Sequence, residues 1–412
     1  MQTTTKKEKK KEPLLSNILK LFMFAMVLAN IAGSMYGSLL PLYLKSLNAN
    51  VLQVGLFFTL SNILPLILQI LGGWISDSLG RLRSIAMGSV AGVIAHIGII
   101  LAPTWQWVLF GEGFGAITRS LVGPSFSSFI ADQSAEENRA RVFGITESIF
   151  MLVVVIGPPL GGWLADAYGF KFMLIVAAVL YTLAALIRIG MARTAAKGAE
   201  ANPEKLSLAS LKEKLSAMTV LLLAGGVMTW VLITDGVRDI AYTMSFTLES
   251  LYLNEVGGLS MKQIGFLGSI FGICNMITTI PAGKLADKKG ERIAIAGGFL
   301  LDAIGLIIFL NVYSFWGYAV AWGVFGIGVG MMSPAYQSLT SKAVPEKLRG
   351  TAFGLLHSSL GLFSLPAPAV GAQLWTRYTP QTPFRITAGV ALLTIIPVWL
   401  KFKLPDNEIE NK

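Results

Sequence analysis

The sequence predicts an all-α integral membrane protein built from two related halves of six membrane-spanning helices each. Three observations support this fold class: an apolar composition, twelve long apolar runs, and a pattern of motifs that returns after 210 residues. Hydrophobic residues make up 54% of the 412 residues and charged residues only 14%, and the mean hydropathy is +0.64. Because soluble domains average about 25% charged residues, this composition excludes a soluble enzyme domain.

The apolar runs come first, because a helix that crosses the membrane needs about 20 apolar residues. Twelve such runs follow one another along the chain: 18–44, 53–75, 84–102, 105–131, 142–165, 169–192, 217–252, 262–283, 291–311, 314–341, 351–376 and 382–402. The resulting domains are a basic tail (1–17), a six-helix bundle (18–192), a linker (193–216), a second six-helix bundle (217–402) and a second tail (403–412). The linker is either a short amphipathic helix on the membrane surface or a solvated segment.

The net charge of +10 is distributed unevenly across the expected membrane. Of the 33 Lys and Arg residues, 25 fall on the side of the two termini, five in the opposite loops and three within spans. Positive loops stay in the cytoplasm, so we expect a multi-pass protein of the plasma (inner) membrane with both termini cytoplasmic. This distribution argues against a nucleic-acid-binding patch. Cys274 is the only cysteine, which excludes an intrachain disulfide or a cysteine metal cluster.

The repeat is clearest in two short segments, 73–80 and 283–290, which share the pattern Gly, three residues, Asp, two residues, Gly. At the same offset the matching pairs are Gln53 and Gln263, Gly55 and Gly265, Pro124 and Pro334, Arg139 and Arg349, and Pro158 and Pro368. Two matching apolar halves predict a site at the interface that they share.

The repeat also bears on the seventh span. Hydropathy alone favours 216–234, which would leave Asp235, Arg238 and Asp239 outside the membrane. However, Leu251-Tyr252-Leu253 repeats Leu42-Tyr43-Leu44 at an offset of 209. We therefore expect the membrane part at about 227–252, with the three charged residues inside it.

The segment Gly73-x-Ile75-Ser76-Asp77-x-x-Gly80-Arg81 resembles the loop signature of the major facilitator superfamily, and its second copy lies where that family has one. The resemblance implies the major facilitator fold, with Asp77 contacting the start of span eleven as a latch of the outward-open state, and Arg81 pairing with Asp132. Positive charge that merely holds the loop inside is the alternative. The expected latch residues are Gly73, Asp77, Gly80, Arg81, Asp132, Arg139, Gly283, Asp287, Gly290 and Arg349.

The run Gly157-Pro158-Pro159-Leu160-Gly161-Gly162 resembles a Gly-Pro-x-x-Gly-Gly motif of exporters and antiporters of that superfamily. Proline bends a helix and glycine allows close packing at the bend, so the motif favours export, although it also occurs as a plain packing feature. Glu147 and His357 stand 210 residues apart at equivalent positions. They are either an inner gate that responds to pH or side chains that bond the local backbone.

Charged residues within the spans are functional candidates because burial in the membrane is costly. Glu112 and Arg119 lie seven residues apart on one helix face, about 10 Å along the axis, so we do not expect a fixed direct pair. Asp235 and Arg238 could form a permanent ion pair at i, i+3. Asp239 is the leading proton-site candidate and Glu112 the second, as carboxylates that exchange protons in competition with substrate.

In the family that the chain resembles, spans one, four, seven and ten line a central cavity. On these spans the further candidates for substrate contact are Asn30, Tyr36, Tyr242, Trp322, Tyr336 and Gln337. His96 and Asp302 lie on spans that are peripheral in that fold, so we assign them no substrate role.

These features predict a monomeric secondary transporter that works by alternating access, not an enzyme. The expected function is proton-coupled efflux of a small amphipathic organic molecule, with the lipid bilayer as environment, the proton gradient as driving force and no metal or cofactor. The alternatives are uptake of a sugar, metabolite or organic anion with Arg119 and Arg238 as anion contacts, and a lipid or lysolipid flippase. A channel or a receptor is disfavoured, because a channel has no use for the Asp77 latch.

Overall fold

The computed structural model describes residues 15–68, 80–134, 138–195, 226–344 and 363–403, and in these ranges the chain consists of helices and short connections. The helices of the first half are α1 (Asn17–Gly37), α2 (Leu40–Ser46), α3 (Val51–Ser61), α5 (Arg81–Leu101), α6 (Trp105–Asp132), α7 (Arg139–Tyr168) and α8 (Phe170–Ala195). Those of the second half are α10 (Val227–Phe246), α11 (Glu249–Glu255), α12 (Met261–Lys289), α13 (Glu291–Asn311), α14 (Phe315–Ala343), α16 (Ala367–Arg377), α17 (Thr382–Leu393) and α18 (Ile395–Lys401).

Within the described residues, nine helices are long and apolar enough to cross a membrane. α6 and α10 are not among the nine, and they are the helices that carry Glu112 with Arg119, and Asp235 with Arg238 and Asp239. Ionised side chains lower the hydropathy of a helix, and they are kept in membrane proteins where they serve a function. Two long helices that are not among the nine therefore carry most of the candidate site.

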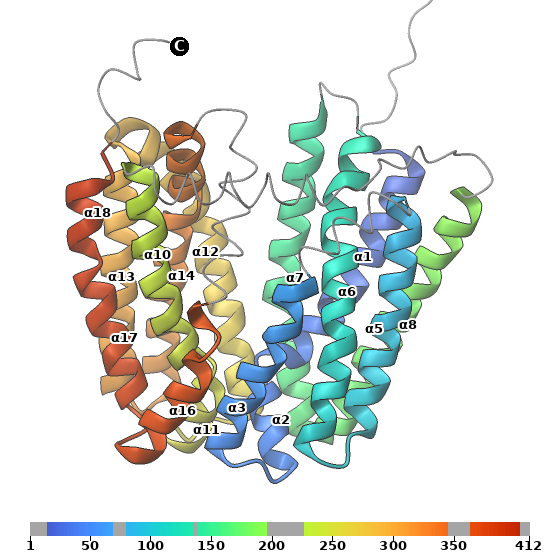
Figure 1. Ribbon diagram of the computed structural model, residues 1–412, viewed down its shortest axis with the longest axis horizontal. Coiled ribbons are helices and arrows are strands. Elements are labelled where there is room, and N and C mark those ends of the chain that lie inside the picture. The colour runs from blue at the N-terminus through green and yellow to red at the C-terminus, as the bar shows by residue number, and fades with distance from the viewer. Residues whose placement is uncertain (1–14, 69–79, 135–137, 196–225, 345–362, 404–412) are drawn as a thin grey trace, which may run out of the picture.

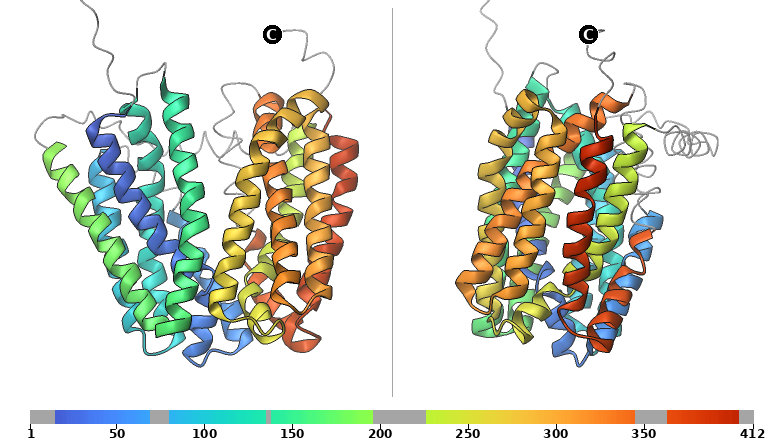
Figure 2. Two further views of the ribbon diagram at one scale, coloured as in Figure 1. Left: turned by 180° about the vertical axis from the view of Figure 1, so that it is seen from behind. Right: turned by 90° about the vertical axis from the view of Figure 1, so that its left-hand side faces the viewer.

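Figure 1 shows two bundles standing side by side, α1 to α8 in one and α10 to α18 in the other. The bundles contact each other through α7 with α12, α3 with α16, and α2 with α11. We call the end of the molecule with α2 and α11 the far end, and the opposite end, where α1 begins and α18 ends, the terminal end. Seen from behind, the bundles converge at the far end and diverge towards the terminal end (Figure 2).

The repeat seen in the sequence is also present in the helix breaks. The first span breaks between α1 and α2, and the seventh breaks between α10 and α11, at positions 209 residues apart. In the first half Pro41 contributes to the break, because proline has no N–H to donate to the carbonyl of Gly37. α10 begins at Val227, where the repeat placed the start of the predicted seventh span, and so contains the three charged residues.

Candidate functional site

The proline-glycine segment of α7 packs against two helices at the far end. Gly157 and Gly161 face α1, where a Cβ atom on Gly161 would overlap the backbone carbonyl of Met35. Gly162 faces α12 of the other half, where an added Cβ atom would overlap the carbonyl of Met261. Because 157 and 161 are four residues apart, they share one helix face, and each of the two faces needs small residues for its own neighbour.

The same packing recurs in the second half with the helices exchanged. Gly371 of α16 packs against the carbonyl of Met244 of α10, as Gly161 does against Met35. Across the halves, Gly265 lies against Pro158, and at the equivalent place Gly55 lies against Pro368. Two equivalent contacts thus join the halves. In one, Gly265 lies against Pro158 and Gly162; in the other, Gly55 lies against Pro368 and Ala372. We call these two contacts together the far-end seal.

Hydrogen bonds between the halves add to the far-end seal at equivalent positions. Pro159 cannot donate to the carbonyl of Val155, and the hydroxyl of Ser269 on α12 donates to that oxygen instead, at 2.5 Å. In the other copy, the N–H of Ala369 in the first turn of α16 donates to Thr59 Oγ1 at 3.2 Å. In each bond the backbone carbonyl or N–H has no partner within its own helix, and closure of the far end supplies that partner.

An ion pair between the halves lies beside the far-end seal. Lys45, at the end of α2, pairs with Glu255, at the end of α11, and the side chains are 46% and 29% exposed. The two residues are 210 apart, so they meet where the pseudo-twofold axis passes between the halves. Identical residues there would place like charges together, whereas Lys45 and Glu255 attract each other across the interface between the halves.

Reversing one of these charges is expected to lower the transport rate about two- to fivefold, because an exposed ion pair contributes about 0.2–1 kcal/mol. Lys45→Glu places two carboxylates together and Glu255→Lys two ammonium groups, so both should favour an open far end. The exchanged variant, Lys45→Glu with Glu255→Lys, should recover the rate, as measured by uptake into vesicles. If the exchanged variant is as slow as the single ones, the pair does not hold the far end.

On α6 the structure corrects the expectation that Glu112 and Arg119 stay apart. Arg119 Nη2 lies 3.3 Å from Glu112 Oε2, and the arginine side chain is 56% exposed while the glutamate is 10% exposed. Gly115 stands between them on the same face and leaves room for the guanidinium to lie along the helix. The long arginine side chain therefore bridges the two helical turns between the residues, although the axial distance alone argued against a direct pair.

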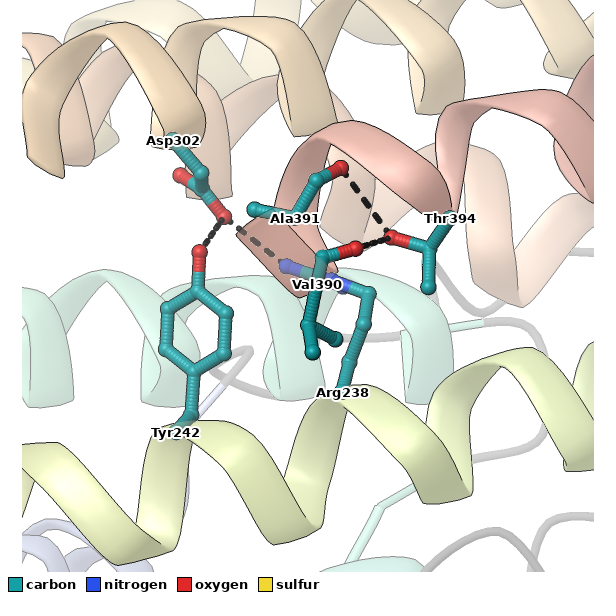
Figure 3. Close-up of polar contacts among 6 residues, drawn as sticks. All are labelled: Arg238, Tyr242, Asp302, Val390, Ala391 and Thr394. Carbon is teal, nitrogen blue, oxygen red and sulfur yellow. Dashed lines mark hydrogen bonds and ion pairs between the residues drawn. The ribbon is translucent and has the colours of Figure 1, made fainter. Parts of the chain in front are cut away.

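On α10 the structure gives Arg238 a partner on another helix. Its Nη2 lies 2.8 Å from Asp302 Oδ2 on α13, a partner that the sequence analysis, which offered Asp235, did not consider. Tyr242 donates to the same carboxylate oxygen at 3.1 Å (Figure 3). Thr394, to the right of Arg238 in the close-up, donates to the carbonyls of Val390 and Ala391, at 2.8 and 3.1 Å (Figure 3). Asp302, to which the sequence assigned no role, is thus the centre of a polar cluster.

Burial shows that Arg238 is not an open cavity residue. Its side chain is 10% exposed and its Cζ lies 3.7 Å from the ring centroid of Phe299. Tyr336 of α14 stacks on Phe299, and its buried hydroxyl lies close enough to Arg238 to interact with its charge. Trp322 is 6% exposed and packs against Phe309 and Phe325. Trp322 therefore belongs to the core of the second bundle, which corrects its prediction as a substrate contact.

The other predicted contacts are accessible to different degrees. Asp239 and Asp235 are half-buried, and Asp239 has no hydrogen bond or ion pair with any described residue. Gln337 is exposed, and Asn30 is half-buried and donates to the carbonyl of Met26 at 2.8 Å. Tyr36 lies within electrostatic range of Glu112 and Arg119, so it joins their side of the site.

The first bundle has a buried cluster that sequence reasoning missed. Arg188 of α8 is 1% exposed and donates to Ser89 Oγ at 3.1 Å and to Met26 Sδ at 2.8 Å. His96 stacks on Tyr181, with ring centroids 4.6 Å apart, and its Nδ1 lies 2.8 Å from the carbonyl of Gly92. The signal in the sequence was Arg188 itself, an ionisable residue within a span.

At the terminal end, Arg81 Nε lies 3.8 Å from Asp132 Oδ2, so the structure brings this predicted pair together. Residues 210 positions later form the same bridge with the charges exchanged: Lys342 Nζ lies 2.6 Å from Glu291 Oε1. Gly80 and Gly290 precede these helices with φ of +85° and +90°, a conformation that favours glycine. The repeat offset could have revealed Glu291 and Lys342, which the sequence reasoning did not single out.

The remaining latch and gate residues are not brought together. Asp287, Arg139 and Glu147 are exposed and make no ion pair with a described residue. Gly283 is half-buried near Pro334. The predictions for Gly73, Asp77, Arg349 and His357 lie outside the described residues. Among the described residues no group of three or more His, Cys, Asp or Glu could hold a metal ion.

Comparison with known proteins agrees with this architecture. Residues 22–237 and 231–412 each match the family model of the Major Facilitator Superfamily. The multidrug resistance protein MdtG of Dickeya zeae is 24% identical over 388 residues, covering 91% of this chain and 92% of MdtG. The quinolone resistance protein NorA of Staphylococcus aureus (strain MSSA476) is 24% identical over 368 residues, covering 88% and 90% of the two chains.

Solved structures share the fold at lower identity. The nucleoside transporter NupG superimposes with a TM-score of 0.78 at 14% identity, covering 94% of this chain and all of NupG (100%). A peptide transporter, POT, in complex with sulfate gives a TM-score of 0.77 at 16% identity, covering 94% and 96% of the two chains. At these identities the likeness concerns the fold alone.

Proposed function

Because the chain belongs to the major facilitator superfamily, and is therefore a multi-pass membrane transporter and not an enzyme, we propose that it exports a small amphipathic cation in exchange for protons. It does so as a monomer with twelve spans and both termini in the cytoplasm, as the distribution of Lys and Arg favours. In that orientation the terminal end faces the cytoplasm. The structure then represents the state that loads substrate from inside, with the far-end seal closed.

The charge balance of the site carries the choice of a cation. Arg119 is paired with Glu112 and Arg238 with Asp302, so the two arginines that could have bound an anion each have a carboxylate partner. Asp239, in contrast, is half-buried without a partner among the described residues. A carboxylate in the membrane interior costs about 2.5–3.5 kcal/mol, and a bound cation offsets that cost. We therefore place Asp239 at the substrate site and Tyr36 and Glu112 on the opposite wall.

Export is supported by similarity and by packing. The relatives MdtG and NorA are named for resistance to multiple drugs and to quinolones. The proline-glycine segment of α7, which resembles the motif of exporters, forms part of the far-end seal. A seal of glycine against backbone closes the outer side tightly while the site is open to the cytoplasm.

Transport into inverted membrane vesicles tests this function. With the vesicle interior made acid, a radiolabelled lipophilic cation, tetraphenylphosphonium, is expected to accumulate, and collapse of the pH gradient should release it. Vesicles without the protein and vesicles with the far end cross-linked through Lys45→Cys and Glu255→Cys are the controls. Proton-driven efflux of an organic anion such as fluorescein from preloaded vesicles, without movement of the cation, would favour the uptake rival in which the arginines bind substrate.

A further inference from the structure

We propose that Asp302 is a proton-binding residue of this transporter, and that Arg238 is the switch through which its proton acts on the cation site. The inference rests on the proposed function, since it explains how protons and a cation are exchanged. Asp302 lies on a span to which neither the sequence motifs nor the fold assign a role. Its place in the structure argues for one.

The carboxylate of Asp302 is bonded on one oxygen only. Oδ2 accepts from Arg238 Nη2 at 2.8 Å and from the Tyr242 hydroxyl at 3.1 Å, while Oδ1 is buried without a hydrogen-bond partner among the residues that the structure describes (Figure 3). Oδ1 points at Gly328 of α14, where even a Cβ atom would crowd it. A buried acceptor without a donor is costly, and a proton on that oxygen removes the charge that burial disfavours.

The groups that face Asp302 explain why its charge depends on Arg238. From α10 they are Arg238 and Tyr242, and from α14 the nearest titratable side chain is Tyr336, which reaches Arg238. α12, α17 and α18 also pack against α13. In the described ranges none of their acidic or basic side chains contacts Asp302. Arg238 is therefore the one cation that neutralises this carboxylate within those ranges.

Arg238 has another carboxylate near the same face of its own helix. Asp235 lies one turn earlier, and both Asp235 and Arg238 act electrostatically on the Tyr336 hydroxyl. Asp239 is the next residue along the chain and lies on a different face of α10, beside the charge of Arg238 but not opposite its guanidinium. Phe299 and Tyr242 lie 3.7 and 5.1 Å from the guanidinium and hold it without fixing its partner, because a ring face attracts a cation from any direction above it.

These contacts define an exchange. When Asp302 takes up a proton, Arg238 loses its counter-ion and turns towards Asp235, so its uncompensated positive charge acts on Asp239 and releases the cation. When a cation binds Asp239 from the cytoplasm, Arg238 returns to Asp302, which then gives up its proton. Proton and cation thus exclude each other without sharing a carboxylate. The coupling is expected to be about 5–150-fold in affinity, the range of such linked sites.

Binding of tetraphenylphosphonium to the purified full-length protein, followed as a function of pH, tests the switch. In the wild type the affinity should rise at least fivefold from acid to neutral pH, with a proton released for each cation bound. Asp302→Asn imitates the protonated state, so its affinity should be low at every pH with no proton release. Arg238→Gln combined with Asp302→Asn removes the competing cation, so affinity should return while the pH dependence stays absent.

Glu291→Gln is the matched control, since Glu291 is a buried carboxylate on the same helix that pairs with Lys342 at 2.6 Å. It should keep both the pH dependence and the proton release. If Asp302→Asn does not fold, the double variant tests the role of Asp302 instead. Its side chains at positions 238 and 302 are both neutral, so neither is left as an unpaired buried charge. Persistent pH dependence in the double variant overturns the role of Asp302. A wild type that binds no cation overturns the proposed function instead, and pH-independent binding by the wild type overturns the switch alone.

Discussion

Replacing Gly162 by valine is expected to lower transport at least tenfold by preventing closure of the far end. Gly162 lies where α7 of one half meets α12 of the other, with Lys262 Cα and Gly265 Cα each 3.2 Å from the place of an added Cβ atom. These neighbours are backbone atoms, so the helices must separate to make room. Overpacking costs about 1–3 kcal/mol, which shifts a conformational equilibrium by up to roughly 100-fold.

The control for this prediction lies on the same helix. Gly144 of α7 is exposed and has no atom within 4 Å of an added Cβ atom, so Gly144→Val should transport at the wild-type rate. The distance between spin labels placed at Ser46→Cys and Asn254→Cys, two exposed neighbours that leave the Lys45–Glu255 pair intact, in a variant without Cys274, reports on the far end. It should lengthen in Gly162→Val and stay short in Gly144→Val. A short distance together with normal transport would show that the seal tolerates the larger side chain.

The far-end seal shows how far the sequence alone reaches. The proline-glycine run of α7 was recognisable as a close-packing motif because its residue types have a steric meaning wherever they occur. The residues that pack against this run were not recognisable in the same way. Gly55 and Gly265 stood out only as matching positions of the repeat, and their contacts are known only once the helices are placed. The bond from Ser269 to the carbonyl of Val155 depends on which face of α12 turns towards α7. Periodicity predicts the faces of a helix, but not the neighbour of each face.

The charged residues show the same limit. Arg238 and Asp302 are 64 residues apart and lie on different helices, so their pairing depends on the rotation of α10 and α13 about their axes. Sequence separation made Asp235 the more obvious partner for Arg238. By contrast, the bridge between Glu291 and Lys342 repeats Arg81 and Asp132 at the 210-residue offset, and the repeat could have predicted it. In this chain the repeat carries more three-dimensional information than hydropathy does.

Asp239→Asn is expected to weaken binding of a lipophilic cation more than tenfold at neutral pH. A carboxylate 4 Å from a cation contributes about 4 kcal/mol at an effective dielectric constant of about 20, and each 1.4 kcal/mol is a factor of ten in affinity. Solvent in the open site reduces this contribution, so the expected loss is closer to 1.4 kcal/mol than to the full value. Fluorescence titration of the purified protein with ethidium measures it.

Two matched substitutions separate a local charge effect from a general one. Glu147→Gln removes an exposed carboxylate of α7 at the terminal end, and Asp166→Asn removes one near the far end of the same helix. Both should leave the affinity within twofold of the wild type, because exposed charges more than a Debye length of about 8 Å away are screened. A loss confined to Asp239→Asn places the cation on α10. Equal losses in all three variants would mean that the overall negative potential, and not a carboxylate at the site, attracts the substrate.

Stronger binding of an organic anion by Asp239→Asn would support the uptake alternative, because removing the carboxylate would then unmask Arg238 as the substrate contact.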